Sequence, residues 1–548
     1  MNKIENDLIK GIAEVIKEKF DHEAAEGTIM VEIPKDNTNG DYSTNIAMRL
    51  TKVLKRRPQE IAQEIVSGLE TKLAFADKIE IAGPGFINFW IKKTELASVI
   101  NTVLDAGSKY GHNNSGNGYP VLLEYVSANP TGILHLGHAR GAAWGDSCAR
   151  LYNASGYNCL REYYINDAGH QMDMLALSVQ ARYRELFGLD FELPQDGYHG
   201  KDIIGVAEQI KAEYGDKWLH ESDEVALPFF KAEGKRLEMK RIEDDLKYYR
   251  CEFDSWMSEQ WIVDEGLVDK ALEVMIAKGL CYEEDGAFWF KSTEYGDDKN
   301  RVLKKSDGFY TYLTPDIANH EYKFERGYKL LVNLWGADHH GYIPRMKAAI
   351  EAMGHPRNSL EVDIIQMVRL VENGKEVKMS KRTGNAITIR ELCDDIGVDS
   401  TRYFFLSRAL DSHLDFDLGL ARTQSNENPV YYAQYAHARI CSVLRQVEEV
   451  KRLDSYDLLV SEKETDLLKY INEFPGVVAD AAATRSPNKI CNYIQKLAMY
   501  FHSFYGAHKI IDKNNEALTN QRLALLLATK ITLTNALDFL GVSAPEKM

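Results

Sequence analysis

The chain has 548 residues, 45% of them hydrophobic and 27% charged, with a formal net charge of −16. A chain of this length can bury several cores, so roughly two to four domains are expected. No apolar run approaches the roughly 20 residues that cross a bilayer, and the charged amphipathic start lacks the apolar block of a signal peptide, which predicts a cytoplasmic protein without membrane contact.

The cysteines and the charge narrow the chemistry further. The seven cysteines are odd in number, scattered and never spaced as C-x-x-C, so we expect neither a disulfide framework nor a zinc site. The acidic balance argues mildly against a polyanionic partner, because net positive charge usually marks nucleic-acid binding. Two local basic runs, Lys52–Arg57 and Lys378–Arg382, are candidates for such contacts, although a solvated surface is the commoner reason for a charge run.

Residues 1–110 predict a separate α+β domain. A helical start is followed by the β-like runs TIMVEIP and FINFWI and by the turn-forming segment Gly83–Gly85. The next stretch, Ser108–Pro120, concentrates Gly, Asn and Ser, as a linker does.

Residues 120–395 predict a Rossmann-like domain with a doubly wound parallel sheet. The run VLLEYV indicates a buried strand, ANPTG a loop, and residues 134–153 a helix. Two later apolar runs, LREYYI and KLLVNLW, are each followed by a polar loop and a helical pattern. We expect a helical insertion at about 185–295, a connecting segment at 396–425 and an all-α bundle at 426–548.

The segment HLGH places His135 and His138 three residues apart, directly after the predicted strand and loop. At that spacing both imidazoles share one helix face beside the positive helix N-terminus. The small Gly137 lets a nucleotide approach the backbone, so the segment suits a triphosphate. Ordinary helix-start histidines or half of a metal site are the alternatives, and the strand–loop–helix context favours the phosphate site.

A second segment, Lys378-Met379-Ser380-Lys381, lies in a polar, glycine-containing loop near the end of the same predicted domain. Two lysines on such a loop can close over phosphates and neutralise the charge of a departing pyrophosphate. Taken alone, this tetrapeptide would often be a solvated turn.

Together the two segments resemble the paired signatures of class I aminoacyl-tRNA synthetases. Leu136 stands where the first signature has isoleucine, and Arg382 stands where the second ends in serine. The segments GDYSTNIA, GPGFINF, REYYINDAGHQ, GADHHGYIPRM and YAHARI are similar to arginyl-tRNA synthetases in particular. The resemblance covers nearly the whole chain and implies an N-terminal domain that contacts tRNA and a C-terminal bundle that binds the anticodon.

A pocket for arginine needs carboxylates and hydroxyls, because the guanidinium group is planar, always charged and presents five donors. Glu124 and Asn129 flank the end of the first strand, and Tyr312 and Asp316 lie one helical turn apart; all four are expected to point into one cleft. A strand-end Glu or helix-start Asp is nevertheless more often a cap or a surface ion pair.

The resemblance implies a binding role for further residues. His339 and His340 follow a strand at the carboxyl edge of the sheet, where open α/β folds bind ligands. The implied arginine site consists of Glu124, Ser127, Asn129, Tyr312, Asp316 and His340. The implied ATP site consists of Pro130, Thr131, Gly132, His135, Gly137, His138, Asp338, His339, Lys378, Met379, Ser380 and Lys381. The implied catalytic residues are His135, His138, Lys378 and Lys381.

The implied reaction activates L-arginine with ATP and Mg²⁺, releases pyrophosphate, and transfers arginine from the adenylate to the 3′-terminal ribose of tRNA(Arg). We expect a monomer. Three alternatives stay open: an adenylyltransferase, which would not need the bundle; a protein that only binds RNA; and a synthetase for cysteine or glutamine. Because the implied chemistry lies between Glu124 and Lys381, we expect a chain ending near Ser425 to keep its arginine and ATP pockets but to charge tRNA poorly.

Overall fold

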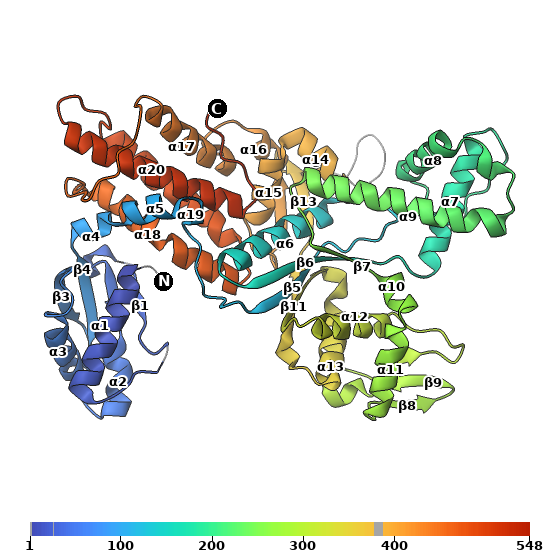
Figure 1. The fold of residues 1–548 in the computed structure, drawn as a ribbon, viewed down its shortest axis with the longest axis horizontal. Helices are drawn as coiled ribbons and strands as arrows, with labels where there is room; N and C mark the ends of the chain where they lie inside the picture. Colours follow the sequence, from blue (N-terminus) through green and yellow to red (C-terminus); the bar gives the residue numbers. More distant parts are fainter. Residues whose placement is uncertain (1–2, 26, 35, 378–386) are drawn as a thin grey trace.

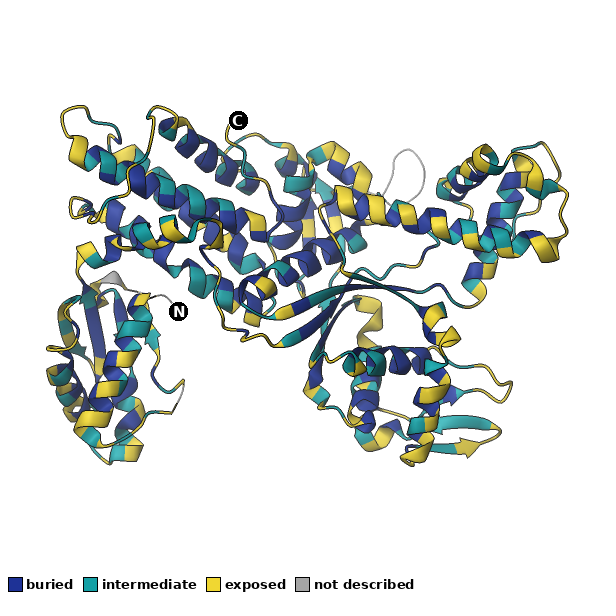
Figure 2. Ribbon diagram, viewed as in Figure 1, coloured by how far each residue is buried: buried dark blue, intermediate teal, exposed yellow. Residues whose placement is uncertain are grey.

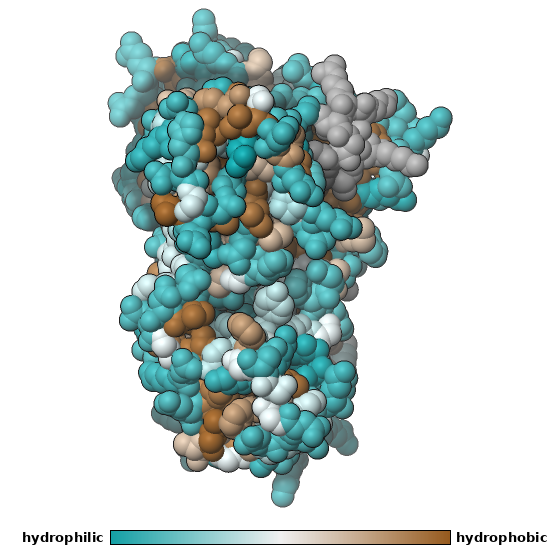
Figure 3. All heavy atoms as spheres, turned by 90° about the vertical axis from the view of Figure 1, so that its right-hand side faces the viewer, coloured by the Kyte–Doolittle hydropathy of each residue, from teal (hydrophilic) through white to brown (hydrophobic). Residues whose placement is uncertain are grey.

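The computed structural model describes residues 3–25, 27–34, 36–377 and 387–548. In these ranges the chain forms an elongated molecule in which an N-terminal domain, a central sheet region with a projecting helical arm, and a C-terminal group of helices are seen in Figure 1. The face shown in Figure 3 is largely hydrophilic, with hydrophobic residues in scattered patches. Within the described ranges no helix combines the length and apolar character that a membrane-spanning segment needs.

The N-terminal domain is a four-stranded antiparallel sheet, in the order β1-β2-β4-β3, packed against three helices. The apolar stripes of the helices, with Leu8 and Ile65 among them, meet the buried side of β4 at Phe89 in one small core. The elements are α1 (Lys3–Phe20), β1 (Val31–Glu32), β2 (Tyr42–Thr44), α2 (Ile46–Leu54), α3 (Pro58–Leu69), β3 (Ala76–Ala82) and β4 (Phe86–Ile91).

The central domain is built on a five-stranded parallel sheet, in the order β12-β11-β5-β6-β7. On β5, Val121 and Leu123 belong to the core beneath α6, whereas Leu122 belongs to the core formed with α12 and α13. Helices therefore cover both faces, and the predicted doubly wound sheet is confirmed (Figure 1). The strands and these helices are β5 (Pro120–Glu124), α6 (Leu136–Ala154), β6 (Asn158–Ile165), β7 (Ser255–Ser258), α12 (Leu313–Glu325), β11 (Leu330–Gly336), α13 (Ile343–Met353) and β12 (Leu360–Ile365).

The strand order reverses between β5 and β11. From β5 the chain proceeds to β6 and β7 on one side, and it returns to place β11 and β12 on the other. In open α/β sheets the loops leaving such a switch point diverge and leave a crevice at the carboxyl ends of the strands. The loop before α6 and the loop after β11 lie at this point.

The segment expected as one insertion, at about 185–295, is divided by β7, which pairs with β6 in the main sheet. Before β7, three helices form an arm with its own core: α7 (His170–Glu185), α8 (Lys201–Tyr214) and α9 (Asp223–Tyr248). After β7 come two helices and a small antiparallel sheet: α10 (Glu259–Asp264), α11 (Leu267–Ala277), β8 (Cys281–Glu284), β9 (Ala287–Phe290) and β10 (Arg301–Lys304). The sequence SWMS is only four residues long and half serine. A search for long apolar runs therefore did not predict β7 as a strand.

The segment expected to be a connector, 396–425, contributes a strand to the domain. β15 pairs in parallel with β13, and β14 completes a three-stranded sheet. The elements are β13 (Val368–Glu372), β14 (Lys375–Glu376), α14 (Ile389–Ile396), α15 (Val398–Leu406), β15 (Leu414–Asp417) and α16 (Leu418–Arg422).

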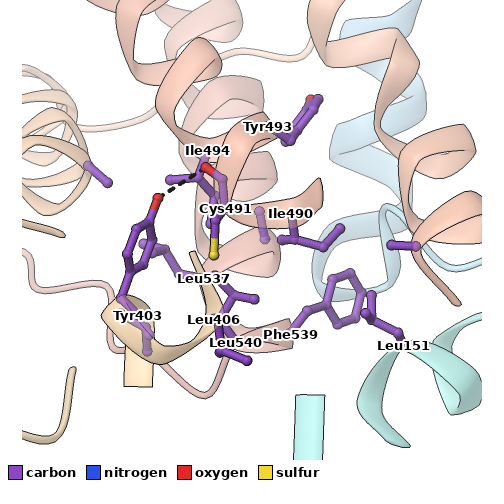
Figure 4. Packing of buried hydrophobic residues seen from close by; sticks show 14 of the residues in the cluster. Leu151, Tyr403, Leu406, Ile490, Cys491, Tyr493, Ile494, Leu537, Phe539 and Leu540 are labelled. Atoms are coloured by element: carbon purple, nitrogen blue, oxygen red, sulfur yellow. Dashed lines mark hydrogen bonds between the residues drawn. The ribbon is translucent and has the colours of Figure 1, made fainter. Parts of the chain in front are cut away.

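The C-terminal helices share one continuous core with the central domain. Tyr403 of α15 donates a hydrogen bond to the carbonyl of Cys491 at 3.0 Å, among Leu406, Leu537 and Leu540 (Figure 4). Buried residues of α6 and of these helices belong to one cluster, and Figure 2 shows buried segments along both. The helices are α17 (Pro429–Leu444), α18 (Glu462–Ala483), α19 (Asn488–Ala507) and α20 (Glu516–Phe539).

This shared core changes two expectations. The segment 93–110, which we assigned to the N-terminal domain, carries α4 (Lys93–Ala97) and α5 (Val99–Ala106), and α5 packs on α18 and α20 instead. A chain ending near Ser425 would also expose apolar residues such as Leu406, so its folding as an intact catalytic domain is not expected.

Candidate active site

A cleft of about 670 Å³ opens at the switch point, within the size range of small-molecule sites. We call it the sheet-edge cleft. It is formed by the loop between β5 and α6, the end of β11 and the residues that follow β12. Its lining includes nine predicted site residues: Ser127, Asn129, Thr131, Gly132, His135, Gly137, His138, Asp338 and His339.

The two histidines cap the helix that begins the site. His135 is the N-cap of α6, and its Nδ1 accepts a hydrogen bond from the backbone N–H of Gly137 at 3.1 Å. The hydrogen bonding is reciprocal: the Nδ1 of His138, one turn later, accepts from the backbone N–H of His135 at 3.1 Å. Their ring centroids lie 3.9 Å apart. The helix therefore starts at Leu136, two residues later than predicted.

The local environment favours the neutral form of both imidazoles. Burial lowers the pKa of His135, and burial together with the nearby His135 lowers the pKa of His138 to about 3. In each neutral ring the Nδ1 atom is an acceptor, so the proton is on Nε2. The pair consequently offers two N–H donors at the positive end of α6, where an anion is favoured.

The predicted ATP residues divide into three groups. Seven of them line the cleft: Thr131, Gly132, His135, Gly137, His138, Asp338 and His339. Pro130 is buried beside it. Lys378, Met379, Ser380 and Lys381 lie outside the residues that the structure describes.

The predicted arginine residues are not all brought together. Ser127 and Asn129 line the cleft. Asp316 lies in the first turn of α12, and one of its oxygens accepts from the Tyr342 hydroxyl at 2.5 Å. Tyr312 is 80% exposed and His340 is exposed, so neither side chain is packed into the same place as Asp316.

Glu124 is committed to a buried ion network. One of its oxygens binds the ammonium group of Lys323, and the other accepts from the Ser127 hydroxyl at 3.2 Å. Lys323 also lies 3.6 Å from Glu162, which in turn pairs with Arg326 at 2.5 Å. Although burial alone would lower it, the two carboxylates raise the pKa of Lys323. Glu124 therefore forms an ion pair, but a buried one and not the surface ion pair or cap that we weighed as the alternative.

A second hollow, of about 430 Å³, lies on the C-terminal helices. We call it the bundle pocket. The His502 ring lies 4.9 Å from the Tyr432 ring and 6.0 Å from the Tyr435 ring, measured between centroids. The Arg439 guanidinium lies 4.7 Å from the Tyr505 ring centroid. Aromatic faces beside an arginine suit a flat, anionic ligand such as a nucleotide.

Comparisons with known proteins agree with this arrangement. Three family descriptions match: Arginyl tRNA synthetase N terminal domain over residues 6–91, tRNA synthetases class I (R), catalytic domain over residues 99–404, and DALR anticodon binding domain over residues 433–548. The chain is 54% identical over 540 residues to the Arginine--tRNA ligase of Bacillus subtilis (strain 168), which covers 98% of this chain and 97% of that protein. This chain belongs to the arginyl-tRNA synthetase family.

Other members of the arginyl-tRNA synthetase family support the match over the full length. Arginine--tRNA ligase 1 of Bacillus anthracis is 52% identical, with 100% of both chains covered. The structure of the Thermus thermophilus arginyl-tRNA synthetase superposes with a TM-score of 0.75 at 22% identity, covering 100% of both chains, and therefore shares this fold.

Several residues near these sites were not predicted from the sequence. Gln366 and Met367 follow β12 and line the sheet-edge cleft, and the carbonyl of Gln366 accepts a hydrogen bond from the buried Arg140 at 2.8 Å. Their position directly after a strand of the parallel sheet could have predicted that they line the site, because open α/β sheets bind ligands at the carboxyl ends of their strands. The bundle pocket could not be predicted from the sequence, because its aromatic residues come from two helices far apart in the chain.

Proposed function

We propose that this chain catalyses the arginine–tRNA ligase reaction in the sheet-edge cleft, with the triphosphate of ATP held at the N-terminus of α6. The observation that carries this assignment is the pair of neutral imidazoles whose Nε2–H groups are left to donate at a helix start on the switch point. Family membership supports the same reaction class and removes the adenylyltransferase and cysteine or glutamine synthetase alternatives.

The first step forms arginyl-adenylate. A carboxylate oxygen of arginine attacks the α-phosphorus of ATP, the bond from that phosphorus to the bridging oxygen breaks, and pyrophosphate leaves with the electron pair. Donors from His135 and His138 stabilise the charge that grows on the phosphate oxygens. Lys378 and Lys381, as the resemblance implies, add positive charge at the departing pyrophosphate.

The second step transfers arginine to tRNA. A ribose hydroxyl at the 3′ end of tRNA attacks the activated carbonyl, and AMP departs as the leaving group. Recognition of the tRNA is assigned to the C-terminal helices, where the bundle pocket offers Tyr435, Tyr505 and Arg439 for stacking and phosphate contact. The family match over residues 433–548 supports this role.

Magnesium fits the sheet-edge cleft as a companion of ATP. Among the described lining residues Asp338 would supply the carboxylate, with 80% of its side chain exposed. A donor set with one carboxylate suits an ion held chiefly by substrate phosphates and water, as Mg²⁺ commonly is. The ion would neutralise phosphate charge at that position.

Pyrophosphate exchange with each amino acid in turn, with and without total tRNA, tests this proposal. We expect exchange with arginine alone among the amino acids, and greater exchange when tRNA is present. Exchange with another amino acid would contradict the assigned specificity, and ATP turnover without tRNA charging would contradict the ligase assignment.

A further inference from the structure

Arg140 is a fully buried cation beside the sheet-edge cleft, in the second turn of α6. Two other basic side chains in the described part of the chain are buried as completely, and each has a carboxylate partner: Arg402 pairs with Asp146, and Lys323 pairs with Glu124. Arg140 forms no ion pair with any described residue. A buried charge is costly unless other groups compensate it. The groups that compensate Arg140 therefore identify the part of the molecule that its charge stabilises.

Three backbone carbonyls accept hydrogen bonds from Arg140. Its Nη1 donates to the carbonyls of Gln366 at 2.8 Å and Ser412 at 2.9 Å, and its Nη2 donates to that of Ala409 at 2.8 Å. Gln366 follows β12 and lines the sheet-edge cleft, whereas Ala409 and Ser412 lie in the segment between α15 and β15. Burial lowers the pKa of Arg140 to about 10, although the nearby Asp411 opposes this shift, so the guanidinium group is charged at neutral pH. A charged donor thus ties the cleft wall to the segment before β15.

The cleft wall formed by Gln366 and Met367 is held at most of its backbone groups. The N–H of Gln366 donates to the carbonyl of Leu410 at 3.1 Å, and the carbonyl of Met367 accepts from the N–H of Leu414 at 3.2 Å. The N–H of Met367 donates to no residue in the described ranges. In a trans peptide the carbonyl of Gln366 and this N–H point in opposite directions. The hydrogen bond from Arg140 therefore also fixes the direction of an unused donor in the wall.

We propose that Arg140 is a positioning residue of the nucleotide site, which holds the wall at Gln366 and Met367 so that ATP meets a preorganised surface with a free N–H donor. This inference rests on the proposed function, because it takes ATP as the ligand of the sheet-edge cleft. Arg140 itself does not line the cleft and acts through the wall. α6 lies close to this wall, because a Cβ at Gly141 would approach Cδ1 of Ile365 to 2.8 Å. Groups that are held in place before a ligand arrives lose less freedom on binding.

The variant Arg140→Lys keeps the positive charge and removes the planar fork that reaches three carbonyls. We expect the Kd for ATP, measured by calorimetry on the full chain, to rise about three- to tenfold, the range for losing one hydrogen bond. The KM for ATP in pyrophosphate exchange should rise in parallel, because the wall binds the ground state and the transition state alike. The Kd for arginine should stay within about twofold, since Arg140 contacts none of the residues proposed to bind arginine.

Arg402→Lys is the matched control. Arg402 is buried as completely and also donates to two backbone carbonyls, those of Leu540 and Tyr249, but it does not line the sheet-edge cleft. Both variants should lower the thermal midpoint, and only Arg140→Lys should weaken ATP binding. An equal change of ATP affinity in the two variants would show that Arg140 only supports folding, and would overturn the proposal.

Hydrogen exchange supplies a measurement that needs no variant and decides the matter if Arg140→Lys fails to fold. In the wild-type chain, a non-hydrolysable ATP analogue at a concentration that calorimetry shows to be saturating should slow the exchange of the Met367 amide severalfold, because the bound nucleotide accepts from this N–H. An exchange rate of the Met367 amide that is the same with and without the analogue would refute the assigned role.

The outcomes separate this inference from the proposed function. A wild-type chain that binds no ATP would contradict the proposed function and the inference together. A wild-type chain that charges tRNA with arginine, combined with unchanged ATP affinity in folded Arg140→Lys, would refute the role of Arg140 alone.

Discussion

At the scale of single residues, we expect the histidine pair at the start of α6 to act through hydrogen bonds and not through charge. Burial holds the pKa of His138 at about 3 and lowers that of His135. The His138 ring should therefore remain neutral, with the proton on Nε2, throughout the range from about pH 5.5 to 8, and the His135 ring should gain its proton only below the ordinary histidine range. We expect the ¹⁵N shifts of histidine-labelled protein at pH 7.5 to show this tautomer for both rings, with no titration of His138 down to about pH 5.5.

The variants His135→Asn and His138→Asn assign these signals. A ring that titrates near pH 6.5 would contradict the neutral pair. His138→Ala should also lower kcat for arginine activation by about 10²- to 10³-fold, the usual loss on removing one donor that stabilises developing negative charge.

The residues of the candidate site could be predicted unevenly from the sequence. The spacing of His135 and His138 fixes their common helix face, and their position after an apolar strand places them at the sheet edge. The strand β7 could not be found in the same way, because it is four residues long and half of them are serine. The partner of Glu124 is Lys323, 199 residues away in the sequence, and nothing local indicates that contact.

At the scale of elements, the long apolar strands and the amphipathic helices could be predicted from the sequence, because their patterns of apolar residues are strong. The parallel sheet around β5 follows from such runs. The boundary between the central domain and the C-terminal helices could not be predicted. An apolar stripe shows that a helix packs against something, but it does not show against which element.

A buried ion pair joins several of these elements. Arg402 of α15 lies 2.5 Å from Asp146 of α6, and it also donates to the carbonyls of Leu540 at 2.7 Å and Tyr249 at 3.0 Å. Arg402→Met should destabilise the protein by about 3 kcal/mol, because it removes the fully buried cation that pairs with Asp146 and a donor to two carbonyls. Arg150, which donates to the same carboxylate at 2.8 Å, keeps the loss at the low end for a broken buried ion pair. The midpoint and slope of the first urea transition measure this loss.

Arg408→Met is the matched control, since Arg408 is exposed just beyond the same helix. It should change stability by less than about 0.5 kcal/mol. An equal loss of unfolding free energy in the two variants would show that the buried hydrogen bonds of Arg402 do not stabilise the protein.

At the scale of the whole molecule, tRNA recognition has to be tested without cutting the chain. The C-terminal helices and α6 belong to one core, so a truncation would confuse loss of RNA contacts with loss of folding. A surface substitution in the bundle pocket avoids this problem. Arg439 is the suitable residue, because it contacts the Tyr435 and Tyr505 rings and forms no ion pair with any residue in the described ranges.

We expect Arg439→Ala to weaken tRNA binding and to reduce the steepness with which affinity falls as salt rises, by about 0.7–0.9 in the logarithmic slope if one phosphate contact is lost. The Kd for arginine should not change, because the residues proposed to bind arginine, Asp316 among them, lie in the central domain. Arg452→Ala removes the same charge from the loop after α17, where Arg452 pairs with Asp105 at 3.0 Å, and it should leave the salt slope unaltered. Filter binding of tRNA over a salt series, with calorimetry of arginine on the same proteins, makes the comparison. If Arg439→Ala and the wild type share one affinity and one slope, the bundle pocket does not bind tRNA.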